Sequence, residues 1–485
     1  MERDERGLQT PAGGGDTAAA KAYLQDLYDY VRMDSDMDPL LLFEQLCCML
    51  VRDVGEEEYR AMTALGPDAL IRWYEKMVNQ HCAGELGWRV STHEFMRRPE
   101  LLQRFLTAVR GVRARVRKDP AALGPLLAEF LETLVQSRQS GTLYTPLQTA
   151  REIVKFLNQE RQTALSTEVL DPACGSGAFL AAALEHMGAE NSVGRLHFLG
   201  LEREERLRTC VSQLACFYGT RVRVEMEEGG PVLDIGRAAF DVILANPPFR
   251  AQTLRDRERF GDTGDLPIRT NDIHRAFLQR ILLGLRPGGE CAVIVPDSFL
   301  GASSGDAIRI RRWIVDEFQC RSVVKLPYYT FYPQATVNAS VLFIRRPEPS
   351  EKGNPERERV FFFSVDVDGR SNDTRRLPVS RNDFDELRRA WGERESLWRE
   401  WCGAARGRNV YDVDVPARWD YACFWFGERR NIRSSDYSLL PEQYRPAQLL
   451  SGPVRDPKEL LEELGRLGRE MMDLTARLTE AEYDG

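Results

Sequence analysis

Residues 171–180 decide the fold, and they read Asp171-Pro172-Ala173-Cys174-Gly175-Ser176-Gly177-Ala178-Phe179-Leu180. A short apolar run precedes this stretch and a helical pattern follows it, which predicts a strand, a tight turn and a helix. Gly175 and Gly177 let the backbone approach a ligand closely, and N–H groups at the start of a helix attract an anion. Asp171, just before the glycines, suits a ligand with a positive group. An isolated Gly-x-Gly pair also fits a purely structural turn, and Leu180 replaces the third glycine of nicotinamide-binding proteins.

Short apolar runs rich in β-branched residues continue along the chain and are separated by helical patterns. The seven runs span residues 167–170, 197–201, 221–226, 241–245, 290–295, 322–326 and 339–344. Strands that alternate with helices predict an α/β fold with a doubly wound, mainly parallel sheet. Because ligands of such sheets bind beyond the carboxyl ends of the strands, the residues that follow each strand form the candidate site.

Two further strand ends carry suitable chemistry. The second strand ends at Glu202, whose carboxylate is placed to accept hydrogen bonds from both hydroxyls of a ribose; alone, it is more simply an exposed acid. The fourth strand runs into Asn246-Pro247-Pro248-Phe249. Consecutive prolines end the hydrogen bonding between this strand and its neighbours and leave carbonyl groups without donors. An amino group with two N–H bonds would satisfy these carbonyl groups. Phe249 offers a face to a flipped base. The less favoured alternative is a strand-ending turn with a core Phe.

The composition excludes several classes of protein. No apolar run approaches the roughly 18 residues that span a bilayer, and the N-terminus lacks the features of a signal peptide, so we expect a cytoplasmic protein without a membrane partner. The net charge of −8 gives no general support for nucleic-acid binding, so any such surface must be local. Ten cysteines without a C-x-x-C pair predict reduced thiols, and scattered histidines predict no metal site.

The 485 residues fit about three domains. We expect a flexible tail at residues 1–20, an all-helical domain at residues 21–138 and the α/β domain at residues 139–400. The last region, 401–485, ends in a helix with leucines at heptad spacing, which predicts a coiled-coil-like seam for a partner subunit. The alternative is that this helix packs on the N-terminal helices.

Two segments are locally basic. Residues 97–118 carry eight basic side chains and one acid. Residues 250–275 contain six arginines, with several acids mixed in. Such segments can follow phosphates, which position nucleic acid without reading its sequence. For the first segment, a solvated basic helix is an equally weighted alternative.

Taken together, the motifs resemble those of the N6-adenine DNA methyltransferases that use S-adenosylmethionine (SAM), most of all the modification subunits of type I restriction-modification systems. The motifs are the glycine turn at 171–177, Glu202 and the Asn-Pro-Pro-Phe stretch at 246–249. Further similarity lies in Gly141-Thr142-Leu143-Tyr144-Thr145-Pro146, in residues 285–289 and 292–299, and in Phe331-Tyr332-Pro333. The resemblance is strong over residues 139–346 and looser elsewhere.

This resemblance implies a SAM-dependent methyltransferase sheet with an antiparallel last strand, and transfer of a methyl group from SAM to the N6 amino group of adenine in DNA. The cofactor-binding residues that it implies are Tyr144, Thr145, Pro146, Asp171, Ala173, Gly175, Ser176, Gly177 and Glu202. The catalytic residues that it implies are Asn246, Pro247, Pro248 and Phe249. Its implied partners are DNA, a specificity subunit and other subunits of a restriction or phage-defence complex.

One position departs from the family pattern. An acidic residue commonly follows the third strand, where it would receive the adenine amino group of SAM, but the matching residue here is Gly230. Glu228 and Asp234 are both candidates to replace it. Gly230 leaves open a SAM-binding scaffold or sensor in a defence complex that does not methylate. A separate alternative is an N-methyltransferase acting on protein glutamine or RNA, which also uses an Asn-Pro-Pro-aromatic turn.

Overall fold

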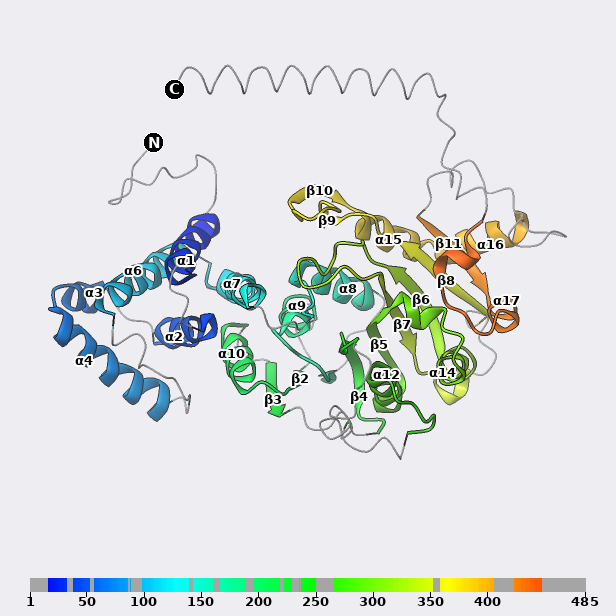
Figure 1. Ribbon diagram of the computed structural model, residues 1–485, viewed down its shortest axis with the longest axis horizontal. Coiled ribbons are helices and arrows are strands. Elements are labelled where there is room, and N and C mark those ends of the chain that lie inside the picture. Colours follow the sequence, from blue (N-terminus) through cyan, green and yellow to red (C-terminus); the bar gives the residue numbers. More distant parts are fainter. Residues whose placement is uncertain are drawn as a thin grey trace, which may run out of the picture.

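A computed structural model describes residues 16–32, 38–52, 56–85, 88, 98–117, 119–138, 143–159, 166–187, 195–218, 222–228, 235, 237–249, 266–351, 358–404 and 423–446. The N-terminal part of these residues is helical (Figure 1). Its helices are α1 (Asp16–Arg32), α2 (Pro39–Val51), α3 (Glu56–Thr63), α4 (Pro67–Met77), the π-helix η1 (Val78–Glu85), α6 (Pro99–Val116), the short η2 (Pro120–Ala122) and α7 (Leu123–Ser137). Helix α1 begins at Asp16, so the tail that was expected to reach residue 20 is shorter. The helix starts this early because the alanines at 18–20 are strong helix formers and Asp16 interacts favourably with the helix dipole.

Helix α2 is the central helix of this region. The Asp38 side chain accepts the Leu40 N–H at 3.0 Å, and Pro39 occupies the first helical position, so the sequence itself starts the helix there. Every residue from Leu40 to Leu50 is buried, because α1, α6, α7 and a helix of the sheet domain pack around α2. An apolar helix of this kind is stable only inside such a bundle.

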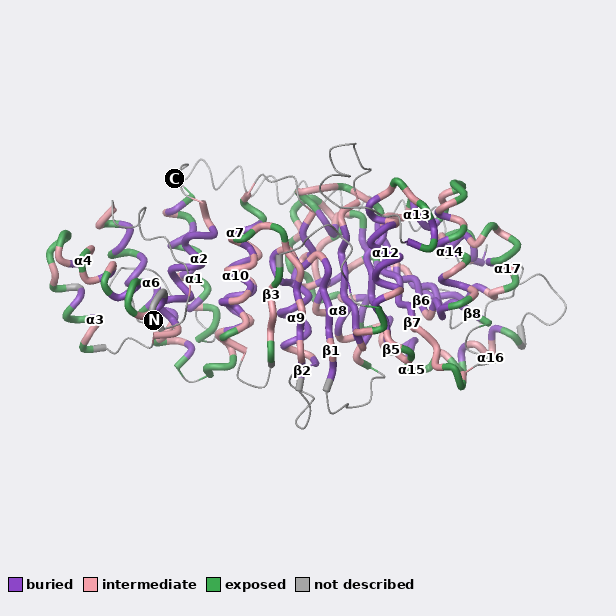
Figure 2. The backbone as a smooth tube through the Cα atoms, turned by 90° about the horizontal axis from the view of Figure 1, so that it is seen from below, coloured by how far each residue is buried: buried purple, intermediate pink, exposed green. Residues whose placement is uncertain are grey.

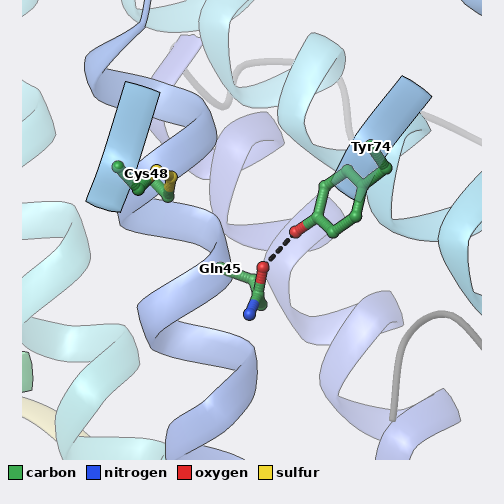
Figure 3. The surroundings of a disulfide bond; sticks show 4 residues. Gln45, Cys48 and Tyr74 are labelled. Carbon is green, nitrogen blue, oxygen red and sulfur yellow. Dashed lines mark hydrogen bonds between the residues drawn. A yellow bond between two sulfur atoms is a disulfide. The ribbon is translucent and has the colours of Figure 1, made fainter. Parts of the chain in front are cut away.

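A disulfide joins Cys48 of α2 to Cys82 of η1, with the two Cα atoms 6.0 Å apart (Figure 3). Beside it, the Tyr74 hydroxyl donates a hydrogen bond to the side-chain oxygen of Gln45. The prediction of reduced thiols throughout is therefore wrong for this pair. The two cysteines are 34 residues apart on different helices, so their spacing in the sequence does not reveal their proximity. The other eight cysteines are free thiols.

In the described part of the chain, nine strands form one sheet in the order β11-β8-β6-β7-β5-β4-β1-β2-β3. The strands are β1 (Ser166–Asp171), β2 (Arg195–Glu202), β3 (Val222–Glu228), β4 (Phe240–Ala245), β5 (Leu285–Pro296), β6 (Gln319–Lys325), β7 (Ala339–Arg345), β8 (Arg359–Ser364) and β11 (Phe424–Glu428). β7 is antiparallel to β5 and β6, β11 is antiparallel to β8, and the other neighbouring pairs are parallel. The predicted doubly wound, mainly parallel sheet is confirmed. It continues through β11, beyond the boundary expected near residue 400.

Helices cover both faces of this sheet (Figure 1). They are α8 (Leu147–Asn158), α9 (Ala178–His186), α10 (Glu205–Ala215), α12 (Ile273–Gly284), α13 (Asp297–Leu300), α14 (Gly305–Asp316), α15 (Asp383–Gly392), α16 (Arg394–Ala404) and α17 (Arg429–Ser434), with short 3-10 turns η3 (Cys216–Tyr218), η4 (Pro349–Glu351) and η8 (Pro441–Tyr444). The strand order reverses between β1 and β4, so right-handed crossovers place α9 and α12 on opposite faces. The strands between them are buried along most of their length (Figure 2). A separate hairpin, β9 (Asp368–Arg370) and β10 (Pro378–Asn382), follows β8.

The helical region and the sheet share one apolar core. α10 packs against α2 and α7, and one cluster of buried apolar side chains extends from Ala20 to Tyr444 through both regions. Ion pairs border this junction: Arg206 contacts Asp38 at 2.7 Å and Arg138 contacts Glu204 at 2.7 Å. Burial raises the pKa of the nearby Glu44 carboxyl to about 7.

Within the described part of the chain, no helix is long and apolar enough to cross a membrane. The expected heptad helix after residue 456 lies outside the described residues.

Candidate active site

Three adjacent strands end side by side at the candidate site. β1 lies between β2 and β4, with Asp171 opposite Gly200 and Leu170 opposite Ile243. Since all three strands are parallel, their carboxyl ends meet at one edge of the sheet. The structure thus brings Asp171, Glu202 and Asn246 to the same edge, at the position where the strand order reverses.

The turn after β1 has a conformation that requires glycine. Gly175 has a φ of 54° and Gly177 a φ of 77°, both in the left-handed region. A Cβ atom on Gly177 would lie 3.0 Å from both methyl groups of Val211. The turn is also tied to β2, because the Cys174 N–H donates to the Leu201 carbonyl at 2.9 Å. The backbone of residues 174–177 is therefore held in a fixed shape.

The Glu202 carboxylate organises this turn. It accepts hydrogen bonds from the backbone N–H groups of Gly175 (2.9 Å), Arg203 (2.8 Å) and Glu204 (2.9 Å). A carboxylate offers about four lone-pair sites, so about one site remains for a further donor such as a hydroxyl. Glu202 is therefore a structural acceptor as well as a candidate ligand residue.

Asp171 is buried, with 1% of its surface exposed, and accepts the Ala173 N–H at 3.0 Å. Burial, together with the negative charge of Glu202, raises the pKa of its carboxyl to about 8. At neutral pH this carboxyl therefore holds a proton, and a positively charged ligand group would favour its ionised form. Ala173 itself contacts the side chains of Ile273 and Phe277.

The segment before α8 lies against the glycine turn. Tyr144 is largely buried, and a Cβ on Gly175 would lie 3.4 Å from its ring. Pro146 occupies the N-cap position of α8. Thr145, which lies between Tyr144 and Pro146 in the sequence, is also buried. Ser176 is also largely buried. The structure therefore places residues 144–146 next to the turn at 175–177, although they lie about thirty residues apart in the sequence.

The end of β4 differs from the end of β1. Asn246 is 8% exposed, and its side-chain oxygen has no hydrogen-bond partner among the described residues. Pro247 and Pro248 follow, and neither has an N–H to donate. A buried acceptor without a donor is costly, so this position is suited to a ligand that brings an N–H group.

The Phe249 ring is held by two aromatic neighbours. It meets His274 edge-on at 5.6 Å between ring centres and Phe331 at 6.3 Å. Burial lowers the pKa of His274 to about 4, so this imidazole is neutral at physiological pH. Neither His274 nor Phe331 was among the predicted site residues. The similarity at Phe331-Tyr332-Pro333 was the signal for Phe331; for His274 the sequence offers none.

Several arginines of the two segments that were predicted to follow phosphates make contacts within the protein. In α6, Arg104 lies over the Tyr30 ring at 4.3 Å, Arg113 donates to the Leu50 carbonyl and Arg115 pairs with Asp16 at 3.9 Å. Arg275 donates to Asp306 at 2.8 Å. These contacts favour structural roles over phosphate binding. Arg97, Lys118, residues 250–259, the Glu228 side chain, Gly230 and Asp234 lie outside the described residues.

Comparison with known proteins places these features in a family. Residues 122–448 match the family model described as N-6 DNA Methylase. The chain belongs to the N-6 DNA methylase family. This N-6 DNA methylase is 24% identical over 386 residues to the type I restriction enzyme EcoEI methylase subunit of Escherichia coli, covering 75% of this chain and 74% of that protein. It is 29% identical over 201 residues to the type II methyltransferase M.BanIII of Aneurinibacillus aneurinilyticus, covering 37% of this chain and 34% of that protein.

Solved structures share the fold of this N-6 DNA methylase. A chain from a structure of complex assembly in a type I R-M system aligns with a TM-score of 0.60 and 19% identity, covering 97% of this chain and all of that one. The type I restriction-modification methyltransferase subunit from Streptococcus thermophilus aligns with a TM-score of 0.57 and 14% identity, covering 88% and 99%. The family resemblance, the fold class and the enzyme class, an adenine-specific DNA methyltransferase, are confirmed.

Proposed function

We propose that this chain transfers a methyl group from SAM to the N6 amino group of adenine in DNA, as the modification subunit of a type I restriction-modification or related phage-defence complex in the cytoplasm. The observation that supports this proposal is the Asn246 side-chain oxygen. It is a buried acceptor without a partner among the described residues, at the end of β4 and three residues before Phe249. An adenine amino group brings the two N–H bonds that such a strand end can accept.

The cofactor would be held at the ends of β1 and β2. SAM supplies a methyl group on a positively charged sulfur. Gly175 and Gly177 leave the backbone bare where a ligand approaches, Glu202 has about one lone-pair site left for a ribose hydroxyl, and Asp171 favours a positive group. Tyr144, Thr145 and Pro146 close this surface from the side of α8, and Ala173 and Ser176 complete the turn.

The target base would be held at the end of β4. Asn246 Oδ1 and the Pro247 carbonyl would accept the two hydrogens of the adenine amino group, and Phe249 would stack on the ring. Fixing both hydrogens aims the nitrogen lone pair at the methyl group, which is an effect of positioning and electrostatics. No covalent intermediate is required. Burial raises the pKa of the Cys174 thiol, which fits a packing residue rather than a nucleophile.

The test is transfer of labelled methyl groups from SAM to DNA of a host that lacks this gene, with the specificity subunit present. Asn246→Ala is expected to lower kcat by about 10²–10³-fold, the usual effect of removing one such acceptor or donor, and to leave SAM binding by calorimetry unchanged. Asn431→Ala in α17, at the opposite edge of the sheet, is the matched control. The proposal fails if Asn246→Ala transfers methyl groups as well as the unmodified chain.

The second candidate is a SAM-binding scaffold or sensor in a defence complex, which Gly230 favours because the expected acid is missing there. SAM binding without modification of any DNA, in every combination of partner subunits, would support it. Mapping methylated adenines in the host genome with and without the gene separates the two candidates. Competition between DNA, RNA and protein acceptors excludes or supports an N-methyltransferase with another substrate.

A further inference from the structure

The large apolar side chains that are exposed in the described part of the chain gather on two segments. They are Tyr328 (43% exposed), Tyr332 (36%), Leu377 (52%) and Val379 (41%). The tyrosines lie between β6 and β7, and Leu377 and Val379 lie in the β9–β10 hairpin. The two segments touch, because the Tyr329 N–H donates to the Asn372 side-chain oxygen at 3.4 Å. Gathered exposed apolar side chains of this kind mark an interaction surface.

Both segments leave the sheet at the edge that carries the active site. β6 and β8 run parallel to β4 and β1, so the chain emerges from them at the same carboxyl edge. The base of the hairpin reaches the start of α8: Asp368 accepts the Thr149 hydroxyl at 3.4 Å. Since residues 144–146 precede α8, the hairpin stands beside the surface proposed for the cofactor.

The tyrosines form a ridge with a fixed shape, defined here as Tyr328, Tyr329 and Tyr332. Neighbouring rings meet edge-on, with centres 5.0 Å apart for Tyr328 and Tyr329 and 6.1 Å apart for Tyr329 and Tyr332. Backbone hydrogen bonds within the segment, such as Tyr332 N–H to the Tyr329 carbonyl at 3.1 Å, hold the turn. Rings ordered in this way bind at a low entropic cost.

The same segment connects the tyrosine ridge to the proposed target site. Phe331 points inward with 1% of its surface exposed, and its ring contacts Phe249 at 6.3 Å. Phe331 thus lies between the ridge and the ring proposed to stack on the flipped adenine. No charged side chain occurs from Leu326 to Asn338. Arg375 on the adjacent hairpin pairs with Asp373 at 3.1 Å, and 75% of its side chain is exposed. Exposed aromatic rings suit the faces of nucleic-acid bases, on which they can stack.

We propose that the tyrosine ridge contacts the DNA next to the flipped adenine, with Tyr328 and Tyr332 stacking on bases exposed where the target has left the helix. The inference rests on the proposed function and extends it from the flipped base to the adjacent DNA. Removing a base from the stack exposes the faces of its neighbours, and aromatic side chains bind such faces without regard to sequence. The hairpin would then follow the sugar-phosphate backbone beside the gap.

The test measures binding of the full chain, with its specificity subunit, to two fluorescein-labelled DNA duplexes. One is fully paired, and the other places an adenine opposite an abasic position, which removes the cost of unpairing that base. The complex is expected to prefer the second duplex. Tyr328→Ala and Tyr332→Ala are each expected to weaken its binding by about tenfold, as loss of one stacked base typically does. Tyr328→Phe and Tyr332→Phe keep the ring and are expected to bind as the unmodified chain does.

Several outcomes would overturn the proposal. Unchanged binding by both alanine variants would do so, as would equal losses in the phenylalanine and alanine variants, or no binding of DNA by the intact complex. If size-exclusion chromatography shows that the alanine variants no longer assemble with the specificity subunit, the surface binds protein instead. The proposed function is judged separately by methyl transfer from the unmodified chain. Transfer with no effect of the tyrosines refutes only this inference, and tyrosine-dependent DNA binding without transfer refutes only the proposed function.

Discussion

The two halves of the candidate active site satisfy their polar groups in different ways. At the ends of β1 and β2, backbone and carboxylate groups bind one another: Glu202 accepts three N–H groups and Asp171 accepts one. At the end of β4, the Asn246 oxygen is buried without a partner among the described residues. The cofactor half is therefore shaped by the protein itself, whereas the target half is completed by whatever enters it. In such a division, the buried Asn246 oxygen gains a donor only when a ligand with an N–H group is bound.

After Asn246→Ala, the largest expected effect also tests the target half. Phe249→Ala removes the proposed stacking face, so kcat/KM for DNA is expected to fall by about 10–100-fold, which corresponds to the loss of one base–aromatic contact. Phe249→Tyr keeps the ring and is expected to retain most of the activity. SAM affinity, measured by calorimetry, should not change in either variant. Equal activity of the alanine and tyrosine variants would remove Phe249 from the site.

The next effect tests the rigidity of the cofactor half. Gly177→Ala forces a side chain into the left-handed region and against Val211, so we expect a loss of about 1–2 kcal/mol of unfolding free energy. Gly175→Ala has a similar backbone cost but an ordinary contact with Tyr144, so its loss of stability should be smaller. Both are expected to weaken SAM binding. Thermal unfolding and calorimetry on the pair measure these effects, and a Gly177→Ala protein as stable as the parent would contradict the geometry.

A third effect concerns pH. The Asp171 carboxyl is protonated in the folded protein up to a pKa of about 8, whereas an unfolded Asp ionises near pH 4. The folded state therefore binds the extra proton between these values, and its stability falls as the pH rises from about 4 to about 8. Asp171→Asn should abolish this loss, so its advantage in Tm over the parent should grow with pH. In the parent, SAM binding should strengthen toward pH 8 and release a proton, which calorimetry in buffers of different ionisation enthalpy detects.

The smallest expected effect separates packing from chemistry in the glycine turn. Cys174 is buried, and its thiol has a raised pKa. Cys174→Ala and Cys174→Ser should therefore retain methyl transfer at close to the parental rate. A complete loss of transfer in both variants, with SAM binding intact, would mean that the thiol takes part in the reaction.

Much of the sheet was predictable because buried parallel strands are continuous apolar runs. β1, β4 and β7 lie within a residue or two of the predicted runs. β5 begins at Leu285 rather than at 290, since Pro287-Gly288-Gly289 has the composition of a turn and yet lies within the strand. β9 and β10 are short and polar, and β11 lies in a region interpreted as a separate C-terminal part, so none of the three was predicted.

The candidate site was predictable to the extent that it depends on strand ends. Parallel strands place Asp171, Glu202 and Asn246 together whatever the detailed packing. The contacts between His274, Phe331 and Phe249 depend on how α12 and the segment after β6 fold back over the edge, which no local pattern encodes. The same holds for the exposure of Tyr328 and Tyr332, since aromatic residues in a sequence give no sign of which rings face solvent. The disulfide between Cys48 and Cys82 likewise depends on tertiary packing.

The junction between α2 and α10 sets the size of the unit that folds cooperatively. α2 packs on α10 within a shared apolar core, and the ion pairs of Arg206 with Asp38 and of Arg138 with Glu204 join the two regions. Each region would therefore expose apolar side chains and unpaired charges if the other were removed. A fragment that starts at β1 would expose the side of α10 that α2 and α7 cover, with its unpaired Arg206. The catalytic sheet should therefore not be expressed as a free-standing piece, and both regions should melt in a single transition.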